Sequence, residues 1–254
     1  REALAINKYK DYDNEILNIA KSLTKKGKNS MQNDDYNSAL KYFIKAIEYS
    51  HQYSTAHFYK GQLYMKLQDF KQAADSFVEG LLINDKNYKI LYMTGNSFEK
   101  LGNLNKSQEF YVKALNIDPS YEKARFALGR VLFSKKQYDE SIKELELLVK
   151  QNNKYSKAYE LLVDIQLELN NLPKAKQYCL DGTNADSKSY PLFARLSGIN
   201  NDQNEYNMAI ENANKAIDLK RNYGPALIEL GRANVHLCNK VAAKDAFSKS
   251  KLDK

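Results

Sequence analysis

Small residues recur along this chain at an unbroken spacing of 34 residues, with packing residues at fixed distances behind them. Seven positions in register begin the pattern: Gly27, Gly61, Gly95, Gly129, Val163, Ser197 and Gly231. Twelve residues after each lies a second small residue: Ala39, Ala73, Ser107, Ser141, Ala175, Ala209 and Ala243. Four residues further on lies a packing residue: Phe43, Phe77, Tyr111, Leu145, Cys179, Ala213 and Phe247. Small residues let two helix axes approach closely, and a larger neighbour fills the space beside them.

Each 34-residue unit has the pattern of two amphipathic helices joined by a polar turn, such as residues 67–70. Apolar residues lie three or four positions apart, as in Ala39, Phe43 and Ala46, which is the spacing of one helix face. Pro119 closes one unit, because proline cannot continue the helix before it. A fixed period of this length predicts that each unit stacks on its neighbours. No segment shows the alternation expected of a strand.

The pattern resembles the tetratricopeptide repeat, whose unit of about 34 residues carries small, aromatic and proline residues at fixed positions. The third unit has the matching residues Gly95, Phe98, Ser107, Tyr111, Ala114 and Pro119. The resemblance covers about residues 20–254 and implies an all-α fold, a right-handed superhelical solenoid of about seven helical hairpins. It implies no particular ligand, because the matched residues pack helices together.

The period divides residues 20–254 into seven tandem units, and residues 1–19 are expected to form a helix of a preceding repeat. The predicted units are 20–53, 54–87, 88–121, 122–155, 156–189, 190–223 and 224–254. Repeat arrays usually end in polar capping helices, and neither end of this sequence shows a clear one. We therefore expect the chain to be a piece of a longer protein and its uncapped ends to favour self-association.

Composition argues against catalysis. The three histidines are scattered over different units, and neither a phosphate-binding loop nor a nucleophile motif is present, so we assign no catalytic residue. Cys179 and Cys238 occupy unlike positions in different repeats, which predicts neither a disulfide nor a zinc site. We expect no cofactor and no metal. The sequence also lacks an apolar run of the roughly 18 residues that a membrane span needs, and the absence of paired cysteines suggests a reducing, cytoplasmic location.

The formal net charge of +8 raises nucleic-acid binding as an alternative, namely an RNA-associated helical-repeat protein. The excess of basic residues is spread thinly over both halves of the chain, however, and basic charge on a helical repeat is usually a solvated face. Nucleic acid is therefore the less favoured partner.

The family resemblance implies that the first helix of each unit lines a concave surface. The expected partner-binding groove runs over the first four units and comprises Lys21, Lys28, Phe58, Gln62, Lys89, Tyr92, Asn96, Lys123, Phe126 and Arg130. The same face of the fifth and sixth units carries Glu160, Asp164, Glu168, Asn201 and Asp202. We interpret the chain as a non-enzymatic protein-interaction scaffold or adaptor within a larger assembly, binding a protein or peptide segment with apolar and acidic residues. A competing interpretation is that the aromatic residues only pack sideways and the lysines only aid solubility.

Overall fold

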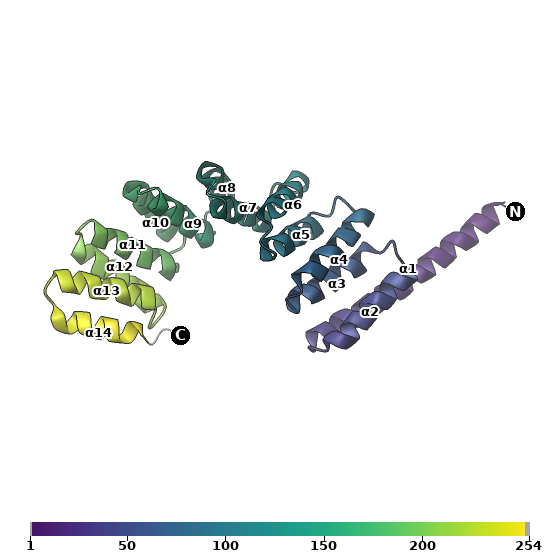
Figure 1. Ribbon diagram of the computed structural model, residues 1–254, viewed down its shortest axis with the longest axis horizontal. Coiled ribbons are helices and arrows are strands. Elements are labelled where there is room, and N and C mark those ends of the chain that lie inside the picture. The colour runs from purple at the N-terminus through teal and green to yellow at the C-terminus, as the bar shows by residue number, and fades with distance from the viewer. Residues whose placement is uncertain (1, 252–254) are drawn as a thin grey trace. The chain divides into compact units, whose positions relative to one another are not determined.

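The computed structural model describes the backbone of residues 2–251 and the side chains of residues 13–251. The described residues form fourteen α-helices and no strand (Figure 1). In chain order the helices are α1 (Glu2–Gln32), α2 (Tyr36–Tyr49), α3 (Ser54–Lys66), α4 (Phe70–Ile83), α5 (Tyr88–Lys100), α6 (Leu104–Ile117), α7 (Glu122–Ser134), α8 (Tyr138–Gln151), α9 (Ser156–Glu168), α10 (Leu172–Ala185), α11 (Tyr190–Asp202), α12 (Tyr206–Leu219), α13 (Gly224–His236) and α14 (Lys240–Ser250). The all-α repeat fold predicted from the sequence is confirmed.

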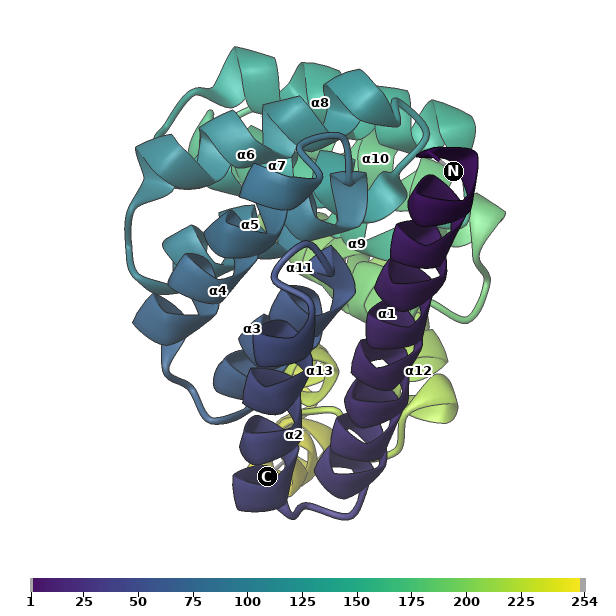
Figure 2. The ribbon, with the colours of Figure 1, turned by 90° about the vertical axis from the view of Figure 1, so that its right-hand side faces the viewer.

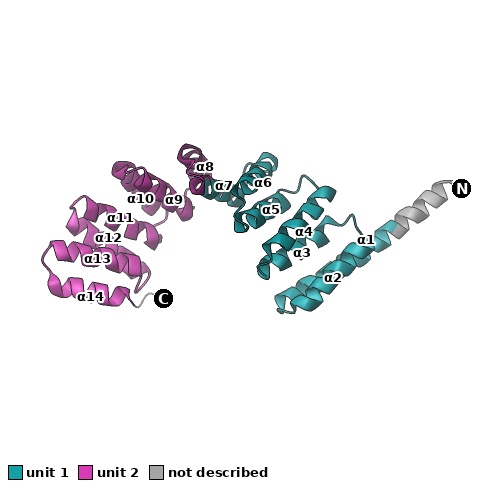
Figure 3. Cartoon of the chain, viewed as in Figure 1, with its two compact units in different colours: residues 1–131 teal, residues 132–254 magenta. Residues whose placement is uncertain are grey.

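Six pairs of successive helices pack together, namely α1 with α2, α3 with α4, α5 with α6, α9 with α10, α11 with α12 and α13 with α14. Within each compact unit second helices also pack on the first helix that follows, as α2 does on α3, α4 on α5, α8 on α9, α10 on α11 and α12 on α13. Two compact units result, Arg1–Val131 and Leu132–Lys254 (Figure 3), and the division falls inside α7. Within the first unit, α1 lies along α2 and also contacts α3 (Figure 2). Within the second unit, α11 contacts α9, α12 and α13. None of the described helices is long and apolar enough to cross a membrane.

The N-terminal helix differs from the expectation for residues 1–19. One helix runs without a break from Glu2 to Gln32, so residue 20 is not a boundary between two helices. The physical reason lies in the sequence, since no glycine or proline before Gly27 interrupts the helix. Ala20 is fully buried against α2 and α3. Its carbonyl accepts a hydrogen bond from the Thr24 hydroxyl at 2.9 Å, one turn further along the same helix.

The position where the two helices of a pair pack most closely shows why small residues recur. A Cβ atom built on Gly61 would lie 2.6 Å from Cε1 of Phe77, far inside van der Waals contact, and Phe77 is fully buried. The same closeness to an aromatic ring holds for Gly27, Gly95 and Gly231. In the fifth unit both members change, because Val163 takes the glycine position and Cys179 the aromatic one, and both are fully buried. The combined volume of Val163 and Cys179 is thus close to that of a glycine and a phenylalanine.

A shared turn joins the two helices of every pair. The first residue after each first helix and its cap has a positive φ: Asp34, Gln68, Gly102, Lys136, Asn170, Asn204 and Cys238. In the turn after α3, the Asp69 amide donates to the Tyr64 carbonyl at 3.0 Å and the Gln68 amide donates to the Met65 carbonyl at 3.2 Å. This is the hydrogen-bond pattern of a Schellman motif, which normally places glycine at the positive φ. The Asp69 side chain then caps α4 by accepting from the Gln72 amide at 3.1 Å.

Replacing Gln68 with glycine should raise the free energy of unfolding by about 0.5–1 kcal/mol. Gln68 has a φ of 60°, a left-handed conformation that costs a residue with a Cβ about 1–2 kcal/mol. Glycine avoids this cost, but it loses more conformational entropy on folding, so the net gain in stability is smaller. Urea unfolding at equilibrium measures the change. The control is Gln72→Gly, at an exposed position inside α4, where glycine should cost up to about 1 kcal/mol. Destabilisation by both substitutions would contradict the role given to this turn.

Candidate partner-binding surfaces

The ten residues of the predicted groove all lie in the first compact unit, on α1, α3, α5 and α7. Lys21, Lys89, Lys123 and Arg130 are exposed, and Lys28, Phe58, Gln62, Tyr92, Asn96 and Phe126 are half-buried. The first helices of successive pairs therefore present the predicted residue types at equivalent positions. Whether these residues bind a partner stays a prediction.

Two aromatic residues of this set, Phe58 and Tyr92, pack against aromatic neighbours while keeping part of their surface exposed. The ring centroid of Phe58 lies 5.3 Å from that of Tyr59 and 5.9 Å from that of Phe77. The Tyr92 ring lies 5.7 Å from Tyr111 and 5.4 Å from Tyr121. Burial raises the pKa of the Tyr92 hydroxyl above its usual value. Sideways packing is thus present, and it holds these rings in fixed orientations.

Three of the five cations of the predicted groove have contacts within the chain, and one of them is Lys89, whose ammonium lies 5.7 Å from the centroid of the Tyr88 ring. The Lys28 ammonium lies 4.7 Å from the centroid of the Tyr59 ring. The Arg130 guanidinium donates to Glu99 Oε2 at 2.9 Å, and the Tyr111 hydroxyl donates to the same oxygen at 2.7 Å. Because Glu99 neutralises Arg130, the charge that this face offers to a ligand comes mainly from the exposed lysines. Sequence reasoning missed Glu99, although its separation of 31 residues from Arg130 is close to the repeat period.

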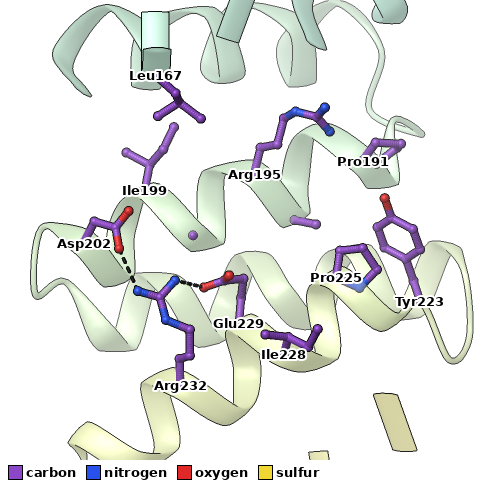
Figure 4. A pocket seen from close by; sticks show the side chains of 12 residues that line it. Leu167, Pro191, Arg195, Ile199, Asp202, Tyr223, Pro225, Ile228, Glu229 and Arg232 are labelled. Atoms are coloured by element: carbon purple, nitrogen blue, oxygen red, sulfur yellow. Dashed lines mark hydrogen bonds and ion pairs between the residues drawn. The ribbon is translucent and has the colours of Figure 1, made fainter. Parts of the chain in front are cut away.

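A second candidate surface lies in the other compact unit, on the first helices α9, α11 and α13. A hollow of about 420 Å³ opens there, walled mainly by apolar side chains that include Leu167, Ile199 and Ile228 (Figure 4). Tyr223, in the turn before α13, closes one side. At the centre α11 carries Gly198, where the equivalent positions of the other first helices carry Lys28, Gln62, Asn96, Arg130, Asp164 and Arg232. A Cβ built at Gly198 would meet the carboxyl group of Glu229 at 3.4–3.6 Å, and no side chain of α11 enters the hollow at this position.

Two charged clusters border this hollow, and in each an arginine is shared by two carboxylates. Arg195 donates from Nε and Nη2 to the Asp164 carboxylate at 3.1 and 3.0 Å, and its Nη1 lies 3.7 Å from Glu160 Oε2. Burial raises the pKa of the Glu160 carboxyl group, against the opposing effect of Arg195.

The second cluster lies at the other end of the hollow in the view of Figure 4. Arg232 donates to Asp202 Oδ1 at 2.7 Å and to Glu229 Oε2 at 2.8 Å. Asn201 donates through Nδ2 to the same Glu229 oxygen at 2.9 Å. The sequence analysis placed Glu160, Asp164, Asn201 and Asp202 on this face, but it did not identify the arginine partners of the three carboxylates or the Glu229 partner of Asn201. Glu168, the remaining residue predicted there, accepts a hydrogen bond from the Tyr138 hydroxyl.

Among the described residues, no three His, Cys, Asp or Glu side chains gather closely enough to hold a metal ion. Cys179 is buried, which raises the pKa of its thiol to about 12, and Cys238 is exposed in the turn before α14. What the two surfaces share is a helical wall on which apolar area is bordered by charged side chains.

Helical hairpins repeated at a fixed period define the class of α-helical repeat proteins. Two family models, both described as tetratricopeptide repeat, match residues 24–88 and 100–162, together about half of the chain. The chain belongs to the tetratricopeptide repeat family. Tetratricopeptide repeats typically form non-catalytic scaffolds for protein interactions, and the fold of this chain is of that kind.

Solved structures with the same fold cover most of the chain. The C-terminal part of a repeat protein from Cytophaga hutchinsonii has a TM-score of 0.73 at 15% identity, over 89% of this chain and 93% of that one. A tetratricopeptide repeat protein from Parabacteroides merdae has a TM-score of 0.68 at 15% identity, over 92% and 93%. YrrB, described as having an unusual peptide-binding site, has a TM-score of 0.55 at 17% identity, over 70% and 92%. No curated protein sequence matches the chain. At these identities the likeness shows the fold alone.

Proposed function

We propose that the chain is a non-enzymatic interaction scaffold or adaptor within a larger assembly, and that its first compact unit binds a partner segment along α1, α3, α5 and α7. The observation that supports this most is the repetition of a half-buried aromatic ring, Phe58, Tyr92 and Phe126, at the same position of three first helices. Half-buried aromatic rings held by their neighbours lose little conformational entropy on binding, which suits them as anchors.

The chemistry of the partner follows from the charge beside these rings. Lys21, Lys89 and Lys123 are exposed at equivalent positions of α1, α5 and α7. A segment with apolar and acidic side chains would place its apolar side chains on the aromatic rings and its acidic side chains near the lysines. YrrB, which shares the fold, is described as having an unusual peptide-binding site, and this supports a peptide as the ligand without indicating its charge. Self-association through the chain ends also stays a prediction, and residues 252–254 lie outside the described residues.

The groove is tested with labelled synthetic peptides in which phenylalanine is flanked by glutamate, using fluorescence anisotropy on the full chain. Phe126→Ala should weaken binding by about 1 kcal/mol or more, or at least fivefold in Kd. Lys89→Glu with Lys123→Glu should slow association and flatten its salt dependence, because exposed charges act mainly on encounter. Melting temperatures of all variants should stay within a few degrees of the parent.

The matched charge control is Lys45→Glu with Lys71→Glu, two exposed lysines on the second helices α2 and α4. This pair should leave peptide binding unchanged apart from the general effect of net charge. If the control pair acts as strongly as Lys89 and Lys123, or if Phe126→Ala lowers the melting temperature without weakening binding, the groove hypothesis is wrong. Tight, salt-sensitive binding of a generic RNA oligonucleotide that depends on Lys89 and Lys123 would instead favour the nucleic-acid alternative.

A further inference from the structure

The hollow on the second compact unit differs from the groove of the first in both shape and charge. Its volume of about 420 Å³ lies in the range of about 300–1,000 Å³ that small ligand pockets occupy. The walls formed by Leu167, Ile199 and Ile228 are apolar, and the side chain of Ile228 on α13 is left 45% exposed. Covering the exposed apolar surface of an isoleucine beside such a hollow with an apolar group of a partner is favourable, because that surface is removed from water.

The charges around the hollow are unbalanced toward carboxylate. Arg195 is shared by Glu160 and Asp164, and Arg232 is shared by Asp202 and Glu229. At the Arg195 end a further cation is near, because the Lys220 ammonium lies 4.9 Å from the centroid of the Tyr223 ring. At the Arg232 end two carboxylates face one guanidinium. The excess negative charge is therefore concentrated at the Asp202–Glu229 end of the hollow.

We propose that the hollow binds a partner segment through one apolar side chain with a basic side chain next to it. The apolar side chain enters the hollow between Leu167, Ile199 and Ile228 and covers the exposed part of Ile228. The basic side chain lies beside Asp202 and Glu229 and compensates the carboxylate that Arg232 alone leaves unmatched. An acidic segment is disfavoured here, because both arginines already donate to carboxylates of the chain.

This inference goes beyond the proposed function, because it concerns other helices and a ligand of the opposite charge. The groove on α1, α3, α5 and α7 is proposed to take an acidic segment, and the hollow on α9, α11 and α13 a basic one. The two sites share no residue. Each can therefore fail in experiment while the other holds.

The test uses fluorescence anisotropy on the full chain, with labelled synthetic peptides in which a central leucine or phenylalanine has lysine on one or both sides. The comparison set replaces each lysine with glutamate. Gly198→Gln should weaken binding of the lysine peptides tenfold or more by filling the hollow. The fold should tolerate this change, because a Cβ on Gly198 would meet Glu229 Cδ at 3.4 Å, an ordinary contact, and glutamine is the native residue at the equivalent position of α3.

Asp202→Asn tests the charge, with an expected loss of about three- to fivefold for the lysine peptides. Its matched control is Asp218→Asn, which removes the same charge from an exposed position on the second helix α12 and should have no such effect. Melting curves identify any variant that fails to fold. The proposal is overturned if the lysine peptides do not bind, if the glutamate peptides bind as tightly, or if Gly198→Gln folds and binds like the parent. Loss of binding in the Phe126 variant with retention in Gly198→Gln would place these peptides in the first unit instead.

Discussion

Replacing Gly61 with valine is expected to lower the free energy of unfolding by about 1–3 kcal/mol, because it overpacks a core that has no space for a side chain. A Cβ at this position would lie 2.6–2.8 Å from three ring atoms of Phe77. Phe77 itself is fully buried and packed by Phe58 and Ile90, so its ring cannot move aside without displacing them.

The fifth unit suggests how the same core can be rescued. There Val163 and Cys179 occupy the positions of Gly61 and Phe77, and both are fully buried. Phe77→Cys alone should cost about 3–5 kcal/mol by leaving a cavity. Gly61→Val combined with Phe77→Cys should cost less than the sum of the single changes, with a coupling of about 0.5–3 kcal/mol, because the valine fills part of that cavity.

Equilibrium urea unfolding of the four proteins in this double-mutant cycle measures the coupling. The control is Gly198→Ala, another glycine on a first helix, where the new Cβ makes an ordinary contact and should raise stability by up to about 1 kcal/mol through helix propensity. Strict additivity of Gly61→Val and Phe77→Cys would mean that the two positions do not share one packing space.

Replacing Arg195 with methionine is expected to lower the free energy of unfolding by about 1–3 kcal/mol at pH 7. The Arg195 side chain is 29% exposed and holds Asp164 and Glu160, whose side chains are 39% and 24% exposed. Without the guanidinium these two carboxylates face each other in a half-buried site. The expected loss lies between that of a surface ion pair and that of a buried one, because solvent screens part of the repulsion.

The loss should depend on pH in a defined direction. Burial already raises the pKa of Glu160, and removal of Arg195 should raise it further above its unfolded value. The folded variant then binds more protons than the unfolded chain, so its stability falls as pH rises through the folded pKa and is recovered as pH approaches about 4.

Urea unfolding at pH 7 and at pH 5 measures this dependence, with the difference between variant and parent expected to be smaller at pH 5. Arg221→Met is the matched control, since Arg221 is exposed in the turn before α13. An equal loss at both pH values would show that Arg195 acts through packing of its aliphatic stem and not through its charge.

The candidate surfaces show where sequence reasoning stops. The sequence located Lys89, Tyr92 and Phe126 on first helices because position within the repeat fixes the helix face. It did not show that Arg130 forms an ion pair with Glu99, or that Arg195 forms one with Asp164. A signal for these pairs exists, because the partners lie 31 residues apart, slightly less than one period. Recognising it requires knowing how far neighbouring first helices are offset, which is a property of their packing.

The turns give a second example. Gly102 is the residue type expected at a positive φ. Gln68 and Lys136 adopt the same conformation, although residues with a Cβ disfavour it. Two hydrogen bonds across the end of α3 and the packing of α4 on it hold Gln68 there. Local sequence could not predict this, because the energy that overcomes the preference comes from contacts made by the whole hairpin.

The sequence by itself determined the repeat, because a 34-residue period of small and large packing residues is compatible with stacked helical hairpins and with little else. It also determined which residues share a first-helix face, since helical periodicity fixes direction along each helix. Only the tertiary structure decided which of those residues already have a partner within the chain. The reason is that pairs such as Glu99 with Arg130 form between neighbouring hairpins, and their distance depends on how the hairpins pack. The tertiary structure also decided that Gly198 lies in the wall of a hollow, because a glycine leaves open space only where the neighbouring helices do not pack over it.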